Sequence, residues 1–82
     1  MVRVLYFASL RENLSLADEV IGEPVTTVSE LLDLLAQRGQ EWDEQLRQNS
    51  RLQIAVNQTM AKRETSIKAG DEIAFFPPVT GG

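Results

Sequence analysis

The sequence predicts an α+β fold in which one main helix packs on one face of a mixed sheet of four to five strands. Two observations support this prediction. Short runs of β-branched and aromatic residues recur along the chain, and one strongly amphipathic segment interrupts them. A lone helix buries a single apolar stripe most economically against one face of a sheet. With 82 residues, the chain has room for one domain.

The first strand is predicted at residues 2–7, where β-branched and aromatic residues predominate. Side chains alternate along a strand, so Val4 and Tyr6 are expected to face the core. The charged residue Arg3 indicates that the other face is exposed to solvent, and Phe7 lies on that same face. The strand therefore combines a core face with a mixed outer face.

The next segment is less regular. The mixed polar stretch Ser9–Leu16 is expected to hold one helical turn. A second, weaker strand is expected at Ala17–Ile21, with Gly22 and Pro24 ending it.

The main helix shows signals for its start, its apolar stripe and its end. Thr27 and Glu30 fit a capping box, in which the hydroxyl accepts an orphan backbone N–H and the carboxylate reaches back. The stripe consists of Val28, Leu31, Leu32 and Leu35. Gly39 favours the left-handed backbone that ends a helix. A shorter helical piece is expected at Glu41–Arg47, and we interpret Trp42 within it as a core residue.

A hairpin is predicted in the second half of the chain. Residues 52–56 alternate as a strand, Asn57 and Gln58 suit a tight turn, and residues 59–62 form a short return strand. The inward residues of the first of these strands are Leu52, Ile54 and Val56.

The last strand is predicted at residues 72–76, directly after a turn signal. Alternation turns Ile73 and Phe75 toward the helix, whereas Ala74 and Phe76 face away from it. If the first and last strands are neighbours, an apolar patch forms on the face away from the helix. Its members are Leu5, Phe7, Ala74 and Phe76. Two interpretations stay open: loops cover the aromatic rings, or the patch binds a protein.

The composition excludes several kinds of site. There is no Cys and no His, which removes disulfides, thiolate nucleophiles and the usual general base and metal ligand. The net charge of −4 argues against nucleic acid, and no stretch approaches the ~20 apolar residues of a membrane span. We expect no metal site, no membrane partner and, without an export signal, a cytoplasmic location. The acidic pairs Asp18-Glu19, Asp43-Glu44 and Asp71-Glu72 are expected to be solvated.

Residues 77–82 are predicted to form a flexible C-terminal tail on a domain of residues 1–76. Pro77 and Pro78 stop the strand ladder and favour extended backbone. Gly81 and Gly82 make the end of the chain thin, so that its terminal carboxylate can enter a narrow ATP-bearing pocket. The extended tail reaches roughly 20 Å.

The terminal octet Phe-Phe-Pro-Pro-Val-Thr-Gly-Gly, residues 75–82, closely resembles the end of the small-subunit family of molybdopterin synthase. Residues 4–8 and 55–59 are similar to the same family, and the resemblance covers the whole chain in element order and length. It implies a ubiquitin-like β-grasp fold.

The resemblance also implies a chemistry. The carboxylate of Gly82, with Gly81 as its narrow neighbour, is adenylated by an E1-like adenylyltransferase that uses ATP. A sulfur donor system then converts it to a thiocarboxylate. This group donates sulfur to a cyclic pyranopterin precursor in the active site of the large synthase subunit, during molybdenum cofactor biosynthesis. The family typically forms a heterotetramer, and the small subunit binds no cofactor and is not itself catalytic.

The resemblance further indicates the residues that contact partners. They are Phe7, Met60, Phe76, Pro77, Pro78, Val79 and Thr80. Phe7 and Phe76 also follow from the alternation of their strands, whereas Met60 rests on the resemblance.

Two alternatives remain. One is another carrier, either a thiamine-pathway sulfur carrier or a ubiquitin-like protein modifier. The other is a plain interaction module with an inert tail. The module, unlike the carriers, tolerates deletion of Gly81 and Gly82.

Overall fold

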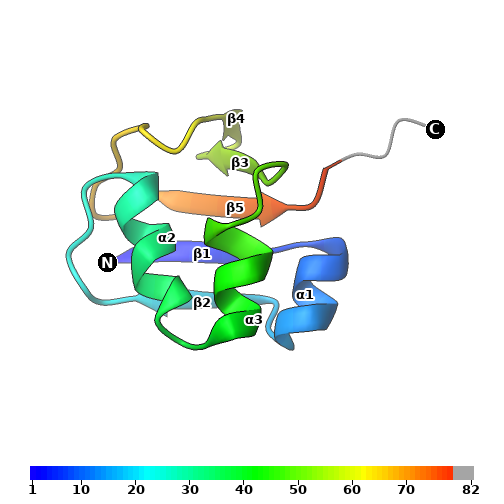
Figure 1. Cartoon of the computed structure of the whole chain (residues 1–82). Coiled ribbons are helices and arrows are strands. Elements are labelled where there is room, and N and C mark those ends of the chain that lie inside the picture. The colour runs from blue at the N-terminus through cyan, green and yellow to red at the C-terminus, as the bar shows by residue number, and fades with distance from the viewer. Residues whose placement is uncertain (79–82) are drawn as a thin grey trace.

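The computed structural model describes residues 1–78 of the chain and shows one mixed sheet with helices on one side (Figure 1). The strands are β1 (Val2–Tyr6), β2 (Asp18–Ile21), β3 (Gln53–Val56), β4 (Thr59–Met60) and β5 (Glu72–Phe76). The helices are α1 (Ala8–Leu14), α2 (Val28–Ala36) and α3 (Gln40–Trp42), which continues as a π-helical turn, η1 (Asp43–Arg47). The predicted α+β class is confirmed.

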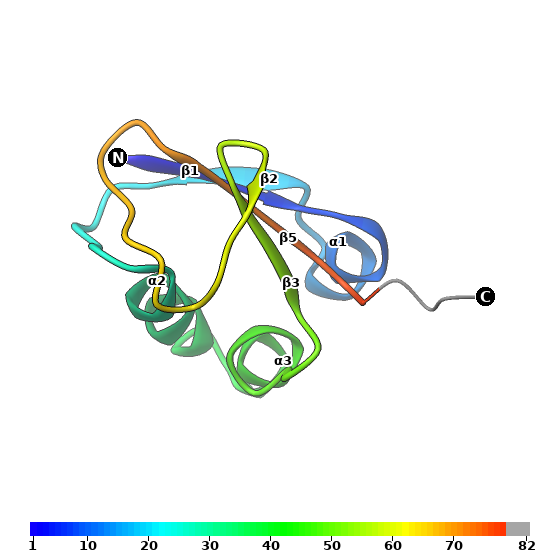
Figure 2. The ribbon, with the colours of Figure 1, turned by 90° about the horizontal axis from the view of Figure 1, so that it is seen from above.

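The strand order is β2-β1-β5-β3-β4. The central strand β5 runs parallel to its neighbour β1, and the other neighbouring pairs are antiparallel. Helices α2 and α3 lie on the same side of the sheet (Figure 2). We call the opposite side, which carries none of the helices of residues 1–78, the open face.

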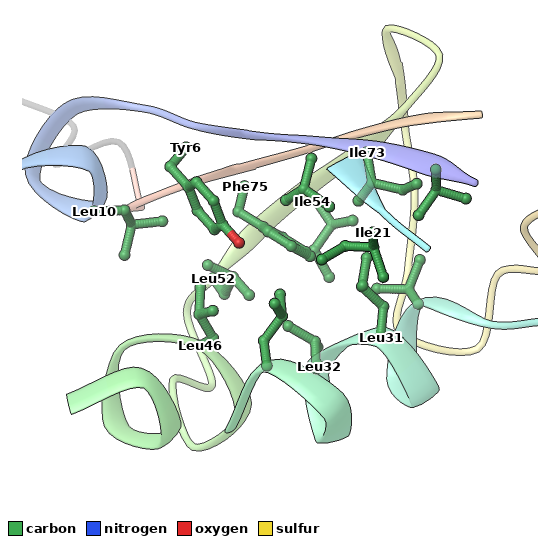
Figure 3. Packing of buried hydrophobic residues seen from close by; sticks show 14 of the residues in the cluster. Tyr6, Leu10, Ile21, Leu31, Leu32, Leu46, Leu52, Ile54, Ile73 and Phe75 are labelled. Atoms are coloured by element: carbon green, nitrogen blue, oxygen red, sulfur yellow. The ribbon is translucent and has the colours of Figure 1, made fainter. Parts of the chain in front are cut away.

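The core lies between the sheet and the helices (Figure 3). The predicted stripe of α2 is buried throughout, with Val28, Leu31, Leu32 and Leu35 each no more than 1% exposed. The sheet contributes inward residues from β1, β5, β3 and β2, which include Val4, Tyr6, Ile73, Phe75, Ile54 and Ile21. The alternation predicted for β1 and β5 is therefore confirmed.

The start of α2 follows the predicted capping box with one change. The backbone N–H of Glu30 donates to Thr27 Oγ1 at 3.1 Å. The Glu30 carboxylate accepts from the backbone N–H of Thr26 at 2.7 Å, one residue earlier than a capping box requires. The helix ends at Ala36 rather than at Gly39, which follows a two-residue turn and has a φ of +141° that only glycine adopts readily.

Three elements differ from the predicted ones. The polar stretch after β1 forms a two-turn helix, α1, because Leu10 and Leu14, one turn apart, are both buried. The return strand β4 is only Thr59–Met60. The second helical piece starts at Gln40 and buries Leu46, as expected, while Trp42 is half-buried against the core.

A polar cluster ties the edge strand β2 to the helices. Glu19 accepts a hydrogen bond from Tyr6 Oη at 2.6 Å and two from the Arg38 guanidinium at 2.6 and 2.7 Å. The guanidinium carbon lies 4.6 Å from the ring centroid of Trp42, which packs edge-on to Tyr6. Burial raises the pKa of Glu19, but these hydrogen bonds outweigh it and leave the pKa below its ordinary value. The expectation that Glu19 is simply solvated was wrong.

Asp71 also departs from that expectation, because its side chain is buried. It accepts hydrogen bonds from Asn57 Nδ2 at 3.0 Å and from the backbone N–H of Lys68 at 2.9 Å. The hydrogen bonds from Asn57 and Lys68 hold the pKa of Asp71 below its ordinary value of 3.8. Asn57 and Gln58 have φ values of +50° and +69°, as their predicted tight turn requires. Asp71 thus fastens the β3–β4 turn to the start of β5.

We expect Asp71→Asn to lower the free energy of unfolding at pH 7, because one carboxylate acceptor becomes an amide donor that faces another donor. Because the pKa of Asp71 is lowered in the folded state, its carboxylate contributes its full stabilisation above pH 3.8, and this contribution is lost as the pH falls through the folded-state pKa. Urea unfolding of both proteins between pH 7 and pH 2 should therefore show a difference in the free energy of unfolding that narrows below pH 3.8. A constant gap, or the same narrowing in the neighbouring Glu72→Gln control, would contradict this assignment.

Candidate functional site

The register of the sheet assembles an apolar row across the open face. Leu5 on β1 pairs with Ala74 on β5, Ala74 pairs with Ala55 on β3, and Ala55 pairs with Met60 on β4. Directly opposed residues of neighbouring strands point to the same face, so these four side chains form one line. Sequence reasoning placed Leu5 and Ala74 on this face, and the pairing of β3 with β5 adds Ala55.

Phe7 and Phe76 extend this row toward one end of the sheet. The backbone N–H of Phe7 donates to the carbonyl of Phe75 at 3.1 Å, which continues the β1–β5 ladder by one residue. The rings of Phe7 and Phe76 are 6.3 Å apart between centroids, in an edge-to-face arrangement. Phe7 is 45% exposed, so the interpretation in which loops cover its ring is wrong. We define the open-face patch as Leu5, Phe7, Ala55, Met60, Ala74 and Phe76.

The two rims of the open face differ. Met60 closes the row on β4 and is 59% exposed. On the far edge strand, Val20 is exposed as well, but Arg3 lies between it and the row. Sequence reasoning did not identify Val20, whose place on this face follows from its pairing with Arg3. The patch thus runs from the centre of the sheet toward β4.

The first residue of α1 has a left-handed backbone conformation. Ala8, directly after Phe7, has a φ of +52°, which is uncommon for a residue with a Cβ. The chain therefore turns sharply out of β1, and the N–H groups of Leu10 and Arg11 fold back onto the carbonyl of Phe7. This turn leaves the Phe7 ring at the end of the strand, beside Phe76.

The predicted tail starts at the same end of the sheet. Pro77 and Pro78 follow β5 directly and are half-buried, and the chain leaves β5 at the end where α1 lies (Figure 1). The other predicted tail residues lie outside the described part of the chain. They are Val79, Thr80, Gly81 and Gly82. The aromatic end of the patch and the root of the tail are therefore adjacent.

The surface cavities of the described residues share no lining residue with the open-face patch. Within residues 1–78 there is no group of three or more acidic side chains that could hold a metal ion. Two surface cavities, of about 360 and 340 Å³, share Pro24 and Val25 in their walls. The larger also involves Met1 and Ile67, so it lies at the end of the sheet opposite Phe7 and Phe76. None of the helices in this part of the chain is long and apolar enough to cross a bilayer.

Comparison with known proteins adds a family to this geometry. Residues 4–82 match the ThiS family. The chain is 42% identical, over the full length of both sequences, to the molybdopterin synthase sulfur carrier subunit of Haemophilus influenzae.

Two solved structures share the fold. A putative molybdopterin converting factor subunit 1 from Pyrococcus furiosus superposes with a TM-score of 0.78 at 28% identity, covering 95% of this chain and 97% of that one. A complex of subunits 1 and 2 of the molybdopterin-converting factor from Helicobacter pylori gives 0.68 at 29% identity, covering 99% and 97%.

Two neighbouring phenylalanines of β5 test the division of the sheet into two faces. Phe75 is fully buried, so Phe75→Ala should lower the free energy of unfolding by about 3–5 kcal/mol. Phe76 is half-exposed on the open face, so Phe76→Ala should cost about 1 kcal/mol. Urea denaturation followed by Trp42 fluorescence measures both. Equal losses would show that the ring of Phe76 is part of the core.

Proposed function

Because the chain belongs to the ThiS family, we propose that it is the sulfur carrier subunit of a molybdopterin synthase. Two observations support this. The full-length relative from Haemophilus influenzae carries that name. In addition, the tail leaves the sheet beside the edge-to-face pair of Phe7 and Phe76, an arrangement that lets one partner hold the domain and receive the end of the chain. The second observation is the one that supports a carrier mechanism, because family membership alone does not say how the chain works.

The proposed chemistry takes place at the carboxylate of Gly82. A carboxylate oxygen attacks the α-phosphorus of ATP on an E1-like enzyme, and pyrophosphate leaves. A hydrosulfide equivalent from the sulfur donor then attacks the carbonyl carbon of the acyl-adenylate, the bond to AMP breaks and AMP leaves, and loss of a proton gives the thiocarboxylate. On the large subunit this sulfur passes to the cyclic pyranopterin precursor. Gly81 allows the narrow approach that both active sites require.

The partners supply everything that the chain lacks. The sequence contains no His and no Cys, so general acid–base and thiol chemistry belong to the activating enzyme, the sulfur donor and the large subunit. The domain contributes recognition. The open-face patch is apolar and includes the exposed side chains of Phe7 and Met60, as protein-docking surfaces do. The relative from Helicobacter pylori was solved as a complex of subunits 1 and 2.

Incubation with an E1-like enzyme, ATP and a sulfur donor tests the carrier step. Intact mass should rise by the exchange of one oxygen for sulfur, and peptide mapping should place the gain on the C-terminal peptide. Deletion of Gly82 should abolish the gain. Unchanged mass with an activating enzyme that converts another carrier would favour the interaction module. Glycyl-glycyl remnants on lysines of other proteins would instead reveal a modifier.

Docking is tested separately. Phe7→Ala and Phe76→Ala should each weaken binding to the large subunit by at least about tenfold, because an aromatic anchor is worth about 2 kcal/mol or more at an interface. Val20→Ala, an exposed apolar residue on the far edge of the same face, is the matched control. Titration calorimetry measures all three dissociation constants. Equal effects of the three changes would contradict docking through the patch.

A further inference from the structure

Met60 is the one sulfur-bearing side chain of the open-face patch. The sequence has no Cys and two methionines, Met1 and Met60. Met60 ends the row that crosses the sheet, opposite Ala55, and is 59% exposed. A thioether that peroxide can reach therefore lies on the surface through which, under the proposed function, the chain meets its partners.

We propose that Met60 is a site of reversible oxidation that controls docking, with hydrogen peroxide as the oxidant. A lone pair of the thioether sulfur attacks one peroxide oxygen, the O–O bond breaks, and the other oxygen leaves as water after proton transfer. Sulfur is oxidised by two electrons to the sulfoxide, and the peroxide is reduced by two. Methionine sulfoxide reductases reverse this step, so the modification acts as a switch.

The effect follows from the surroundings of the sulfur. The sulfoxide oxygen is a strong hydrogen-bond acceptor, and Ala55, directly opposite Met60, and Ala74 beyond it have no side-chain donor to offer it. The amide of Gln53, which lies on the same face opposite Phe76, donates to the carbonyl of Arg51. In the free chain water satisfies this oxygen, because the side chain is exposed. When a partner covers the patch, the water is lost and the polar group is left without a donor. Oxidation should therefore weaken docking and leave folding stability nearly unchanged.

Met1 provides an internal reference. It is 72% exposed, so peroxide reaches it as well. It stands before the first residue of β1, and its carbonyl accepts from the N–H of Gly70, at the end of the sheet away from Phe7. Oxidation of Met1 should not affect the patch, and a bound partner should not shield it.

The experiment uses the full chain, hydrogen peroxide and the purified large synthase subunit. Peptide mapping follows the gain of one oxygen atom on each methionine, and calorimetry measures the dissociation constant before and after oxidation. We expect roughly a tenfold or larger rise for the wild type, since an unsatisfied buried polar group costs at least that factor. Treatment with methionine sulfoxide reductases should restore the original constant, and urea unfolding should be nearly unchanged by oxidation.

Two variants isolate the role of the sulfur. Met60→Leu, which still contains Met1, should have a dissociation constant that does not respond to peroxide, whatever its starting value. Met60→Gln, which places a permanent polar group at the same position, should bind as the oxidised wild type does. Excess large subunit should slow the oxidation of Met60 relative to that of Met1.

The outcomes separate this inference from the function on which it rests. If untreated wild type does not bind the large subunit, the proposed partner is wrong. If it binds and oxidation of Met60 leaves the dissociation constant unchanged, the proposal that oxidation controls docking is wrong. The same holds if Met60→Leu loses affinity on oxidation as the wild type does, or if a bound partner does not protect Met60.

Discussion

The first and last strands of the chain run parallel at the centre of the sheet, from the pair Arg3–Glu72 to the pair Tyr6–Phe75. This pairing joins residues separated by almost the whole sequence. Strand β2 pairs with the free edge of β1, and β3, followed by β4, pairs with the free edge of β5. Because parallel strands end at the same edge, the end of β1 and the root of the tail meet there. The aromatic end of the patch and the proposed chemical end of the molecule are brought together by this register.

The two faces of the sheet differ in what they contribute to the fold. The helix side carries the core and the polar cluster around Glu19, which fastens the short edge strand to the helices. The open face contributes little to the core, so its side chains are free to be chosen for recognition. An inward-pointing charged side chain on an edge strand, such as Glu19 on β2, also discourages pairing with another sheet. Stability and the proposed recognition therefore depend on different residues of the same strands.

Local patterns were enough to predict much of this fold. The stripe and cap of α2, and the alternation of β1 and β5, are set by neighbours in sequence, so periodicity was sufficient to find them. Two features were missed because their causes are non-local. Asp71 is buried because Asn57, fourteen residues earlier, supplies a donor, and Ala55 joins the patch only through strand pairing. For the candidate site, alternation found Phe7 and Phe76, whereas Met60 and the chemistry of Gly82 came from resemblance.

The parallel central pair also decides where the beginning of the chain lies. Both strands start at the edge opposite to Phe76, where the N–H of Gly70 donates to the carbonyl of Met1 at 2.7 Å. An affinity tag, a fluorophore or a solid support joined ahead of Met1 therefore stands a full strand length away from the aromatic pair. The same addition after Gly82 would convert the terminal carboxylate into an amide. Immobilisation through the N-terminus is the geometry in which surface-based kinetics can report on every partner of this chain.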